Sequence, residues 1–329
     1  ENRLGGGEHP TNITSRLTRT HPYAGRVEYS REVEITPEME DQRLVLYMER
    51  TKPSTLWIDG DSIGHQGHIY APHRYELPAL KAGRHEVRIV VDNSSASVPE
   101  EIQGSHAWTD NTQTNWNGIL GDFYIEATPA TYIAQVQVYP SVEEQKALVK
   151  VTVESHREQV AMLHLQTRAW NTDKRHRLLD IRRDVELEEG KNVVELTLDM
   201  GDRMLTWSEF HPALYALNTR LVSAAGEDNV VENFGMRDFA TEGTQFVING
   251  YKTFLRGKHD ACVFPLTGYA PMDVESWRRV FQIAKSYGIN YYRCHSYTPP
   301  KAAFEAADIE GIYFQAELPL WGTISAENN

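Results

Sequence analysis

The sequence predicts a multidomain, mainly β protein in which two β-sandwiches precede a shorter segment of alternating strands and helices. The chain has 329 residues, which is more than a single hydrophobic core usually supports. Short runs of alternating apolar and polar residues fill it from about Tyr23 onward, and this alternation is typical of strands with one buried face. Near Thr241 the pattern changes, and helical periodicity appears. We therefore expect two or three domains.

The first sandwich is predicted from about Tyr23 to Ala127. The dipeptide Asp59-Gly60 lies between apolar residues and suits the positive φ angles of a tight hairpin turn. The strand-like runs are GRVEYSREVEI, RLVLYME, TLWIDGDSIG, HEVRIVVDN and GDFYIEA. Strands at this spacing, without a helical period, predict a β-sandwich.

A second all-β stretch follows ATPATYI. Its runs are AQVQVYP, ALVKVTVES, AMLHLQTRAW, NVVELTLDM and ALYALNTRLVS. About a hundred residues with seven or so strands indicate an immunoglobulin-like sandwich, here without the cysteine pair of antibody domains.

The segment after Thr241 reads as a hairpin followed by β-α-β-α-β. The hairpin FVINGYKTFLRG turns at Asn249-Gly250, and its second strand leads into the loop KHDACVFPLTGYAP. A helix is expected from the N-cap Asp273 to Gly288, then the strand INYYR, a second helix in PKAAFEAADIEG and the strand IYFQAEL. Such units form parallel strands with right-handed crossovers, so residues that follow each strand emerge at one edge of the sheet.

Polar and aromatic side chains are expected after these strands, where α/β proteins bind ligands. The candidates are His259, Asp260, Arg293, His295, Tyr297, Glu317 and Trp321. A cleft with imidazole, guanidinium, carboxylate and aromatic groups suits a polar, hydroxylated, flat-faced ligand such as a sugar.

Each candidate also has a structural interpretation. Arg293 either binds the ligand or pairs with Glu317, which would be costly to bury without a partner. His259 and Asp260 either contact the ligand or cap the following turn. Trp321 either stacks on a sugar face or closes the loop beneath it.

The polar stretch SHAWTDNTQTNWNGILG, within the first sandwich, has two interpretations. One is a surface loop stabilised by turns in which Asn and Asp side chains bond the backbone. The other is an ordered loop that reaches the neighbouring site.

Composition argues against several classes of partner. The net charge of −13, without a block of Lys and Arg, argues against nucleic acid, and no apolar run approaches the length of a membrane span. Cys262 and Cys294 lack zinc-type spacing and are expected to be free thiols. The sequence contains no His/Cys metal set, phosphate-binding glycine loop or G-x-S-x-G elbow, so we expect no cofactor.

Several stretches resemble glycoside hydrolase family 2, the beta-galactosidase and beta-glucuronidase group. The resemblance extends along GRVEYSREVEI, WNGILGDFYIEA, LTWSEFHPALYAL, FGMRDF, FVINGYKTFLRG and GINYYRCHSYTPPKAAFEAADIEGIYFQAELP. It implies three domains: a jelly-roll sugar-binding-type domain over residues 1–130, an immunoglobulin-like β-sandwich over 131–240 and a truncated start of a (β/α)8 barrel over 241–329.

The resemblance also implies a retaining mechanism with two glutamates, whose carboxyl groups lie roughly 5 Å apart. Family members carry these glutamates at the fourth and seventh barrel strands, whereas residues 241–329 fall well short of the about 250 residues of a barrel. The chain is thus expected to be the amino-terminal part of an exo-acting β-glycosidase, inactive alone, with no catalytic residue of its own. Glu317 resembles a family glutamate near the third strand that is not the acid/base.

The roles that the resemblance implies are therefore binding roles. His295, with His259 and Asp260, would bond the terminal sugar, Arg293 would orient a catalytic carboxylate and Trp321 would offer a stacking face. The sequence departs from the family pattern: Cys294-His295-Ser296-Tyr297 stands near Ser-His-Tyr-Pro, and Lys258-His259-Asp260 replaces Val-Asn-x-His. The choice between galactosidase and glucuronidase stays open.

The expected partners are a carbohydrate substrate and a second copy of the parent protein. The divalent-cation and sodium sites of some relatives have no counterpart that can be placed on this chain. Family habit slightly favours a periplasmic or secreted location over the cytoplasm. The rival hypothesis is a non-catalytic carbohydrate-binding or scaffolding protein built from the same sandwiches.

Overall fold

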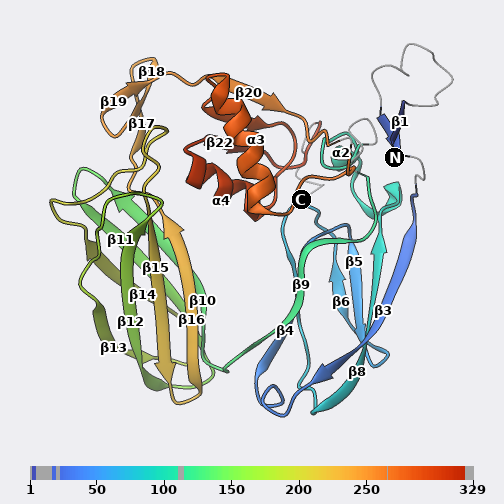
Figure 1. The fold of residues 1–329 in the computed structure, drawn as a ribbon. Coiled ribbons are helices and arrows are strands. Elements are labelled where there is room, and N and C mark those ends of the chain that lie inside the picture. The colour runs from blue at the N-terminus through green and yellow to red at the C-terminus, as the bar shows by residue number, and fades with distance from the viewer. Residues whose placement is uncertain (1, 5–16, 20–22, 110–114, 265, 323–329) are drawn as a thin grey trace.

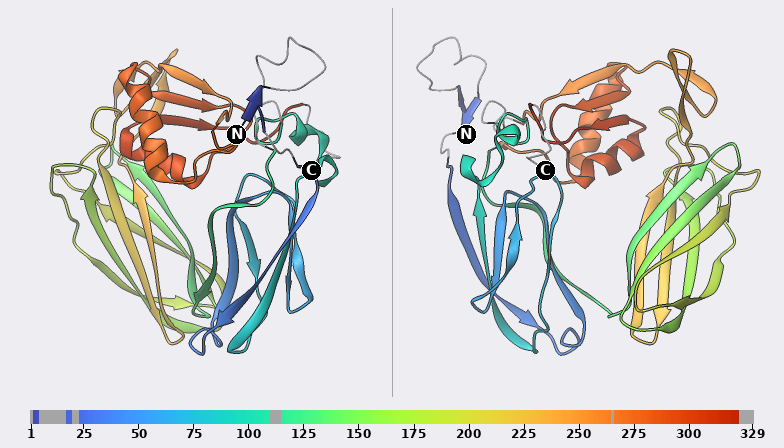
Figure 2. Two further views of the ribbon diagram at one scale, coloured as in Figure 1. Left: turned by 45° about the vertical axis from the view of Figure 1, so that its right-hand side comes forward. Right: turned by 180° about the vertical axis from the view of Figure 1, so that it is seen from behind.

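The computed structural model describes residues 2–4, 17–19, 23–109, 115–264 and 266–322. Two elongated β-sandwiches stand side by side, and a smaller α/β segment lies across one end of the pair (Figure 1). Figure 2 shows the same arrangement from two further directions. The prediction of a mainly β protein is confirmed.

The first sandwich packs two antiparallel sheets, with strand orders β3-β8-β5-β6 and β7-β4-β9. Its apolar core includes Leu46, Leu56 and Ile89. The predicted turn is confirmed, since Asp59 and Gly60 have φ angles of 53° and 90° between β5 and β6. The strands are β3 (Arg26–Ile35), β4 (Arg43–Thr51), β5 (Ser54–Ile58), β6 (Asp61–Gln66), β7 (His73–Glu76), β8 (Gly83–Asp92) and β9 (Ile119–Thr128).

Four short elements accompany this sandwich. Two strands, β1 (Asn2–Leu4) and β2 (Leu17–Arg19), pair with each other. A 3-10 turn, η1 (Ser95–Ser97), and the one-turn helix α2 (Glu100–Gln103) connect β8 to the loop that carries His106. They lie at the end of the sandwich that faces the α/β segment (Figure 1).

The second sandwich also packs two antiparallel sheets, with orders β10-β11-β14 and β13-β12-β15-β16. Val149, Leu163 and Leu217 are fully buried between them. The strands are β10 (Tyr132–Ser141), β11 (Lys146–Ser155), β12 (Gln159–Trp170), β13 (Ile181–Leu187), β14 (Gly190–Asp199), β15 (Leu214–Ser223) and β16 (Gly226–Phe234).

A three-stranded hairpin unit leads into the α/β segment. It comprises β17 (Phe239–Glu242), β18 (Gln245–Ile248) and β19 (Tyr251–Thr253). Asn249 and Gly250, with φ angles of 50° and 80°, form its predicted turn. The segment then consists of β20 (Gly257–Asp260), α3 (Val274–Ser286), β21 (Tyr291–Cys294), α4 (Lys301–Glu310) and β22 (Tyr313–Ala316). The strands pair in parallel in the order β20-β21-β22, as the β-α-β-α-β pattern predicts.

Helix α3 begins where the sequence predicts. The Asp273 carboxylate accepts a hydrogen bond of 2.8 Å from the Ser276 backbone N–H, which satisfies one of the free donors of the first turn. Helices α3 and α4 cover one face of the parallel sheet, where Phe281 of α3 packs on Tyr292 of β21 and Phe314 of β22. Among the described helices, none is long and apolar enough to cross a membrane.

One expectation about this sheet was wrong. His259 and Asp260 were expected in the loop after the hairpin, but they lie in β20. His259 is directly opposite Arg293, which lies in β21 as the predicted strand INYYR implies. Gly257 makes the pairing of β20 with β21 possible. A Cβ there would lie 2.5 Å from the Tyr291 ring, so the two strands can approach only because glycine has no side chain.

Candidate functional site

The carboxyl ends of the three parallel strands bring His259, His295 and Trp321 together. The His295 ring lies 4.9 Å from the His259 ring and 4.9 Å from the Trp321 ring, measured between ring centroids. Because parallel strands present their carboxyl ends at one edge, these residues meet although they come from three separate stretches of sequence. Trp321 is about half exposed (53%), so part of its ring remains accessible to solvent.

His106 of the first sandwich, which the sequence did not single out, completes this group. The imidazole cluster thus consists of His106, His259 and His295, with Trp321 beside them. The His106 ring lies 5.0 Å from His295 and 5.8 Å from Trp321. The His106 backbone N–H donates to Ser296 Oγ over 2.9 Å, and the Trp321 backbone N–H donates to the Glu101 carbonyl over 2.8 Å. The loop around His106 therefore reaches the neighbouring site, which was the second of its two interpretations. The feature of the sequence that could have pointed to His106 was the polar and aromatic composition of the stretch that contains it.

Asp260 serves as a structural anchor beneath these rings. Lys258 Nζ donates to Oδ2 over 2.6 Å, while the Tyr297 hydroxyl and the Cys262 backbone N–H donate to Oδ1 over 2.6 and 3.0 Å. Burial by itself raises the pKa of Asp260, but the bond and charge of Lys258, aided by Tyr297 and Cys262, hold that pKa below its ordinary value. Asp260 is thus an ionised carboxylate with both oxygens engaged, and it caps the turn that follows.

Glu317 and Arg293 form the ion pair that the sequence left as one option. Arg293 Nε donates to Glu317 Oε1 over 2.6 Å, and the Ser296 backbone N–H donates to Oε2 over 2.8 Å. Burial opposes ionisation of Glu317, but the Ser296 and Arg293 bonds outweigh it, so the Glu317 pKa lies below its ordinary value. The carboxylate also fixes Ser296, whose φ of 46° is in the left-handed region.

Arg50 of the first sandwich hydrogen-bonds the loop that follows His295. Its Nη1 donates to the carbonyl of Thr298 over 3.1 Å, and its Nη2 donates to that of Pro299 over 3.0 Å. A third bond of 3.3 Å joins Nη1 to the Ile69 carbonyl of its own sandwich. The imidazole cluster is therefore held by contacts between two parts of the molecule.

Burial shapes the electrostatics of the cluster. Burial first, and then the neighbouring His295 and His259, lower the pKa of His106 below its ordinary value. Asp260 and Glu317 oppose this effect, but both carboxylates already pair with Lys258 and Arg293. The geometry therefore favours a neutral His106 ring, which offers one donor and one acceptor.

The described residues do not form a metal site. In the ranges 23–109, 115–264 and 266–322, no three His, Cys, Asp or Glu side chains are grouped to hold a metal ion. Cys262 and Cys294 are free and buried, as expected, and burial raises the pKa of both thiols, that of Cys294 to about 12. Neither thiol is ready to act as a thiolate ligand or nucleophile.

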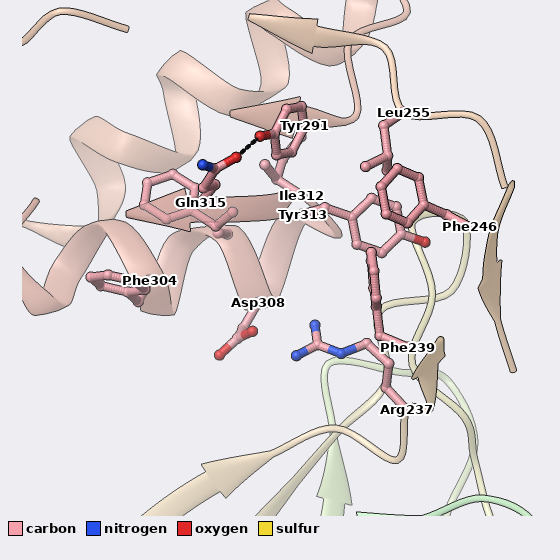
Figure 3. Close-up of a pocket in the computed structure, with 12 residues that line it drawn as sticks. Arg237, Phe239, Phe246, Leu255, Tyr291, Phe304, Asp308, Ile312, Tyr313 and Gln315 are labelled. Atoms are coloured by element: carbon pink, nitrogen blue, oxygen red, sulfur yellow. Dashed lines mark hydrogen bonds between the residues drawn. The ribbon is translucent and has the colours of Figure 1, made fainter. Parts of the chain in front are cut away.

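A separate hollow of about 520 Å³ lies near the amino ends of β21 and β22 (Figure 3). Its wall is mainly apolar and includes Phe239, Phe246 and Tyr313. Figure 3 shows Arg237 and Asp308 pointing toward each other across its lower side. Burial raises the pKa of Asp308 to about 6 although Arg237 opposes the shift. None of the residues that line this hollow is His106, His259, His295 or Trp321.

These features define a mainly β protein whose parallel α/β segment presents imidazole, guanidinium, carboxylate and indole groups at one end. Residues 131–237 match the family model described as Glycosyl hydrolases family 2. The beta-galactosidase large subunit of Latilactobacillus sakei is 24% identical over 299 residues, which cover 89% of this chain. A beta-glucuronidase of Pongo abelii is 25% identical in an alignment 344 residues long, gaps included, that covers 94% of the chain. The chain is thus similar over most of its length to proteins named beta-galactosidase and beta-glucuronidase, and residues 131–237 match the model of glycosyl hydrolases family 2.

The solved structure of a beta-glucuronidase from Bacteroides uniformis shares the fold. Its TM-score is 0.72 at 20% identity, and the match covers 91% of this chain and 36% of that one. The chain also spans only part of its curated relatives, with 45% of the Latilactobacillus sakei protein and 50% of the Pongo abelii protein.

Proposed function

We propose that the chain is the amino-terminal part of a retaining, exo-acting β-glycosidase that removes terminal sugars from oligo- or polysaccharides. The observation that carries this proposal is the convergence of His259, His295 and Trp321 at the carboxyl ends of parallel strands. Such an edge is where α/β barrels place their substrate. Relatives named beta-galactosidase and beta-glucuronidase support the reaction class.

The proposal includes the three domains expected from the sequence, with residues 241–329 as the start of a (β/α)8 barrel. Strands β20 to β22 and their two crossover helices have the parallel arrangement that a barrel needs. Among the described residues, strand β22 pairs on one side only, and the apolar hollow beside it resembles an interior without its full lining. Further βα units of a longer protein would cover both.

Neither carboxylate of the site is suited to be the acid/base. A general acid needs a raised pKa, whereas the pKa values of Asp260 and Glu317 are both lowered by their hydrogen-bond partners. In the proposed enzyme, the acid that protonates the leaving oxygen and the nucleophile that attacks the anomeric carbon come from a later part of the barrel. Asp260 and Glu317 instead hold the binding groups in position.

The geometry supports binding roles for these side chains. His259 and His295, whose rings lie together, would hydrogen-bond the hydroxyl groups of the terminal sugar through their ring nitrogens. Trp321 would stack on an apolar sugar face. Arg293 would act through Glu317, which shapes the loop that carries His295.

The decisive test is the sequence of the source gene beyond the codon for Asn329. We expect the reading frame to continue into further βα units, with Asn-Glu at the fourth strand and a second glutamate at the seventh. A stop codon, or a continuation without those glutamates, would refute the hydrolase and favour the carbohydrate-binding alternative. Calorimetry of this chain against mono- and oligosaccharides then measures whether it binds sugar by itself.

A further inference from the structure

A slot of about 340 Å³ opens between the two sheets of the first sandwich, along the edge strands β3 and β9. Its floor belongs to the apolar core and includes Leu46, Val87 and Ile89, which are at most 4% exposed. Among the described residues, β3 pairs only with β8 and β9 only with β4, so no further strand covers this side. The slot therefore leads from the surface into the core.

The register of β3 decides which of its side chains face the slot. Opposite residues of an antiparallel pair point to the same face of a sheet. Tyr29 lies opposite Ile89, and Arg31 lies opposite Val87. Since Ile89 and Val87 belong to the core, Tyr29 and Arg31 also stand on the inner face of the sheet, and both line the slot.

Aromatic rings form the walls at the mouth of the slot. Phe123 of β9 lies opposite the buried Met48, so its ring faces inward, yet it is 50% exposed. On the other side, the Tyr29 hydroxyl donates to Asn117 Oδ1 over 3.1 Å, which holds that ring in place. An exposed ring on the core-facing side of a sheet is apolar surface that a ligand can remove from water.

Arg31 supplies a positive charge at this mouth. Within residues 23–109, 115–264 and 266–322, no carboxylate lies within ion-pair distance of its guanidinium. Glu34 also lines the slot, but it lies opposite Arg84, whose partner is Glu32 on the outer face of the sheet. The register therefore turns the Glu34 carboxylate away from the inner face on which Arg31 stands.

The lining of the slot determines which ligand fits it. Its volume is near the lower end of the roughly 300–1,000 Å³ that small-molecule sites occupy. The aliphatic floor offers no hydrogen-bond partner to a hydroxyl group, which makes the slot unsuited to a sugar. A guanidinium binds a carboxylate through two parallel hydrogen bonds. The slot is thus suited to a molecule with an apolar body and one carboxylate.

We propose that this slot binds a small amphipathic carboxylate, such as a medium-chain fatty acid. The alkyl chain lies on the aliphatic floor between the two sheets, and the carboxylate pairs with Arg31. The inference is independent of the proposed hydrolase, because none of the residues of the slot belongs to the imidazole cluster.

The test is calorimetry of this chain with three probes of one chain length: octanoate, 1-octanol and octylammonium. We expect octanoate to bind most tightly and octylammonium most weakly, because only the charge of the head group differs in sign. Arg31→Gln should weaken octanoate binding about tenfold, as expected for a lost charge-assisted hydrogen bond, and leave 1-octanol binding unchanged. Phe123→Ser should weaken the binding of both.

Two control variants locate the ligand. Arg84→Gln removes a guanidinium from the outer face of the same sheet and should leave octanoate binding unchanged. Phe246→Glu alters the apolar hollow of Figure 3 and should also leave it unchanged. Amide hydrogen exchange should show protection of residues 29–33 and 123–125 when octanoate is added.

Four results would overturn the proposal. These are no heat from octanoate at millimolar concentration, equal affinities for octanoate and octylammonium, an unchanged octanoate affinity in Arg31→Gln, and loss of binding in Phe246→Glu. The second and third would leave Arg31 as an inward charge that protects an edge strand from pairing with another chain. The fourth would place the alkyl chain in the other hollow. Should Phe123→Ser unfold, Arg31→Gln decides the test by itself, since it changes an exposed side chain.

Discussion

His106 of the first sandwich and His295 of the parallel α/β segment lie with their ring centroids 5.0 Å apart in an edge-to-face arrangement. His259 lies on another side of His295 at 4.9 Å, so three imidazoles from distant parts of the sequence share one site. The contact gives the first sandwich a part in the proposed enzyme, because it supplies one wall of the proposed sugar site.

His295→Ala in the full-length parent enzyme should lower kcat/KM. The loss of a hydrogen bond to the sugar is expected to cost on the order of 1–3 kcal/mol of transition-state binding. Steady-state kinetics on a β-galactoside and a β-glucuronide measures the change. His211→Ala, at an exposed position of the second sandwich, is the matched control and should be neutral. An unchanged kcat/KM in His295→Ala would remove this residue from the site.

Glu317→Gln should lower the free energy of unfolding slightly at neutral pH but not at acidic pH. The lowered pKa of Glu317 means that its carboxylate contributes stability above its ordinary pKa of 4.5, and that this contribution is lost as pH falls through the lowered value. Because Arg293 is 43% exposed, solvent screening limits the effect to about 1 kcal/mol or less.

Urea denaturation of Glu317→Gln at pH 7 and at pH 3 tests this expectation. The difference from the wild type should shrink at the lower pH. Glu143→Gln, at an exposed position of the second sandwich, serves as the control. A destabilisation of equal size at both pH values would show that the charge of Glu317 is not its source.

The contact between the His106 loop and the α/β segment should weaken in mild acid. Burial and the two facing histidines lower the pKa of His106, so the contact is favourable while the ring is neutral. As pH falls below the ordinary histidine value of 6.5, protonation of His106 favours the separated state. Asp260 and Glu317, the facing carboxylates, reduce this effect without removing it, because Lys258 and Arg293 already pair with them.

Amide hydrogen exchange of residues 105–109 at pH 8 and pH 5.5, corrected for intrinsic rates, measures the opening. We expect less protection at pH 5.5 in the wild type and no such difference in His106→Asn. Equal protection of the wild type at both pH values would contradict the account.

The isolated chain should self-associate through the open side of its parallel sheet. In the part of the chain that the structure describes, strand β22 pairs only with β21, and Phe239 and Phe246, beside the hollow of Figure 3, are 48% and 41% exposed. Exposed strand edges and apolar faces promote association. Light scattering over a concentration series measures the mass, and Phe246→Glu should reduce the association. A monomer at all concentrations, with protease resistance beyond Thr241, would contradict the prediction.

Local patterns determined most of the secondary structure. The turns at Asp59-Gly60 and Asn249-Gly250 and the cap at Asp273 were predictable because a few neighbouring residues set their backbone conformations. Strand β20 was missed because its four residues, with Lys258, His259 and Asp260, show no hydrophobic alternation. Its structure depends on pairing with β21, which no short window of sequence contains.

The sequence by itself therefore determined the mainly β architecture, the order of the later elements of the α/β segment and the strand ends after which His295 and Trp321 occur. Only the tertiary structure decided that His106 joins them, that Glu317 pairs with Arg293 and that Asp260 is a buried anchor. The reason is physical. Periodicity and turn chemistry act over a few residues, whereas these contacts join residues that are distant in the sequence. Arg50 in addition joins the first sandwich to the loop after His295.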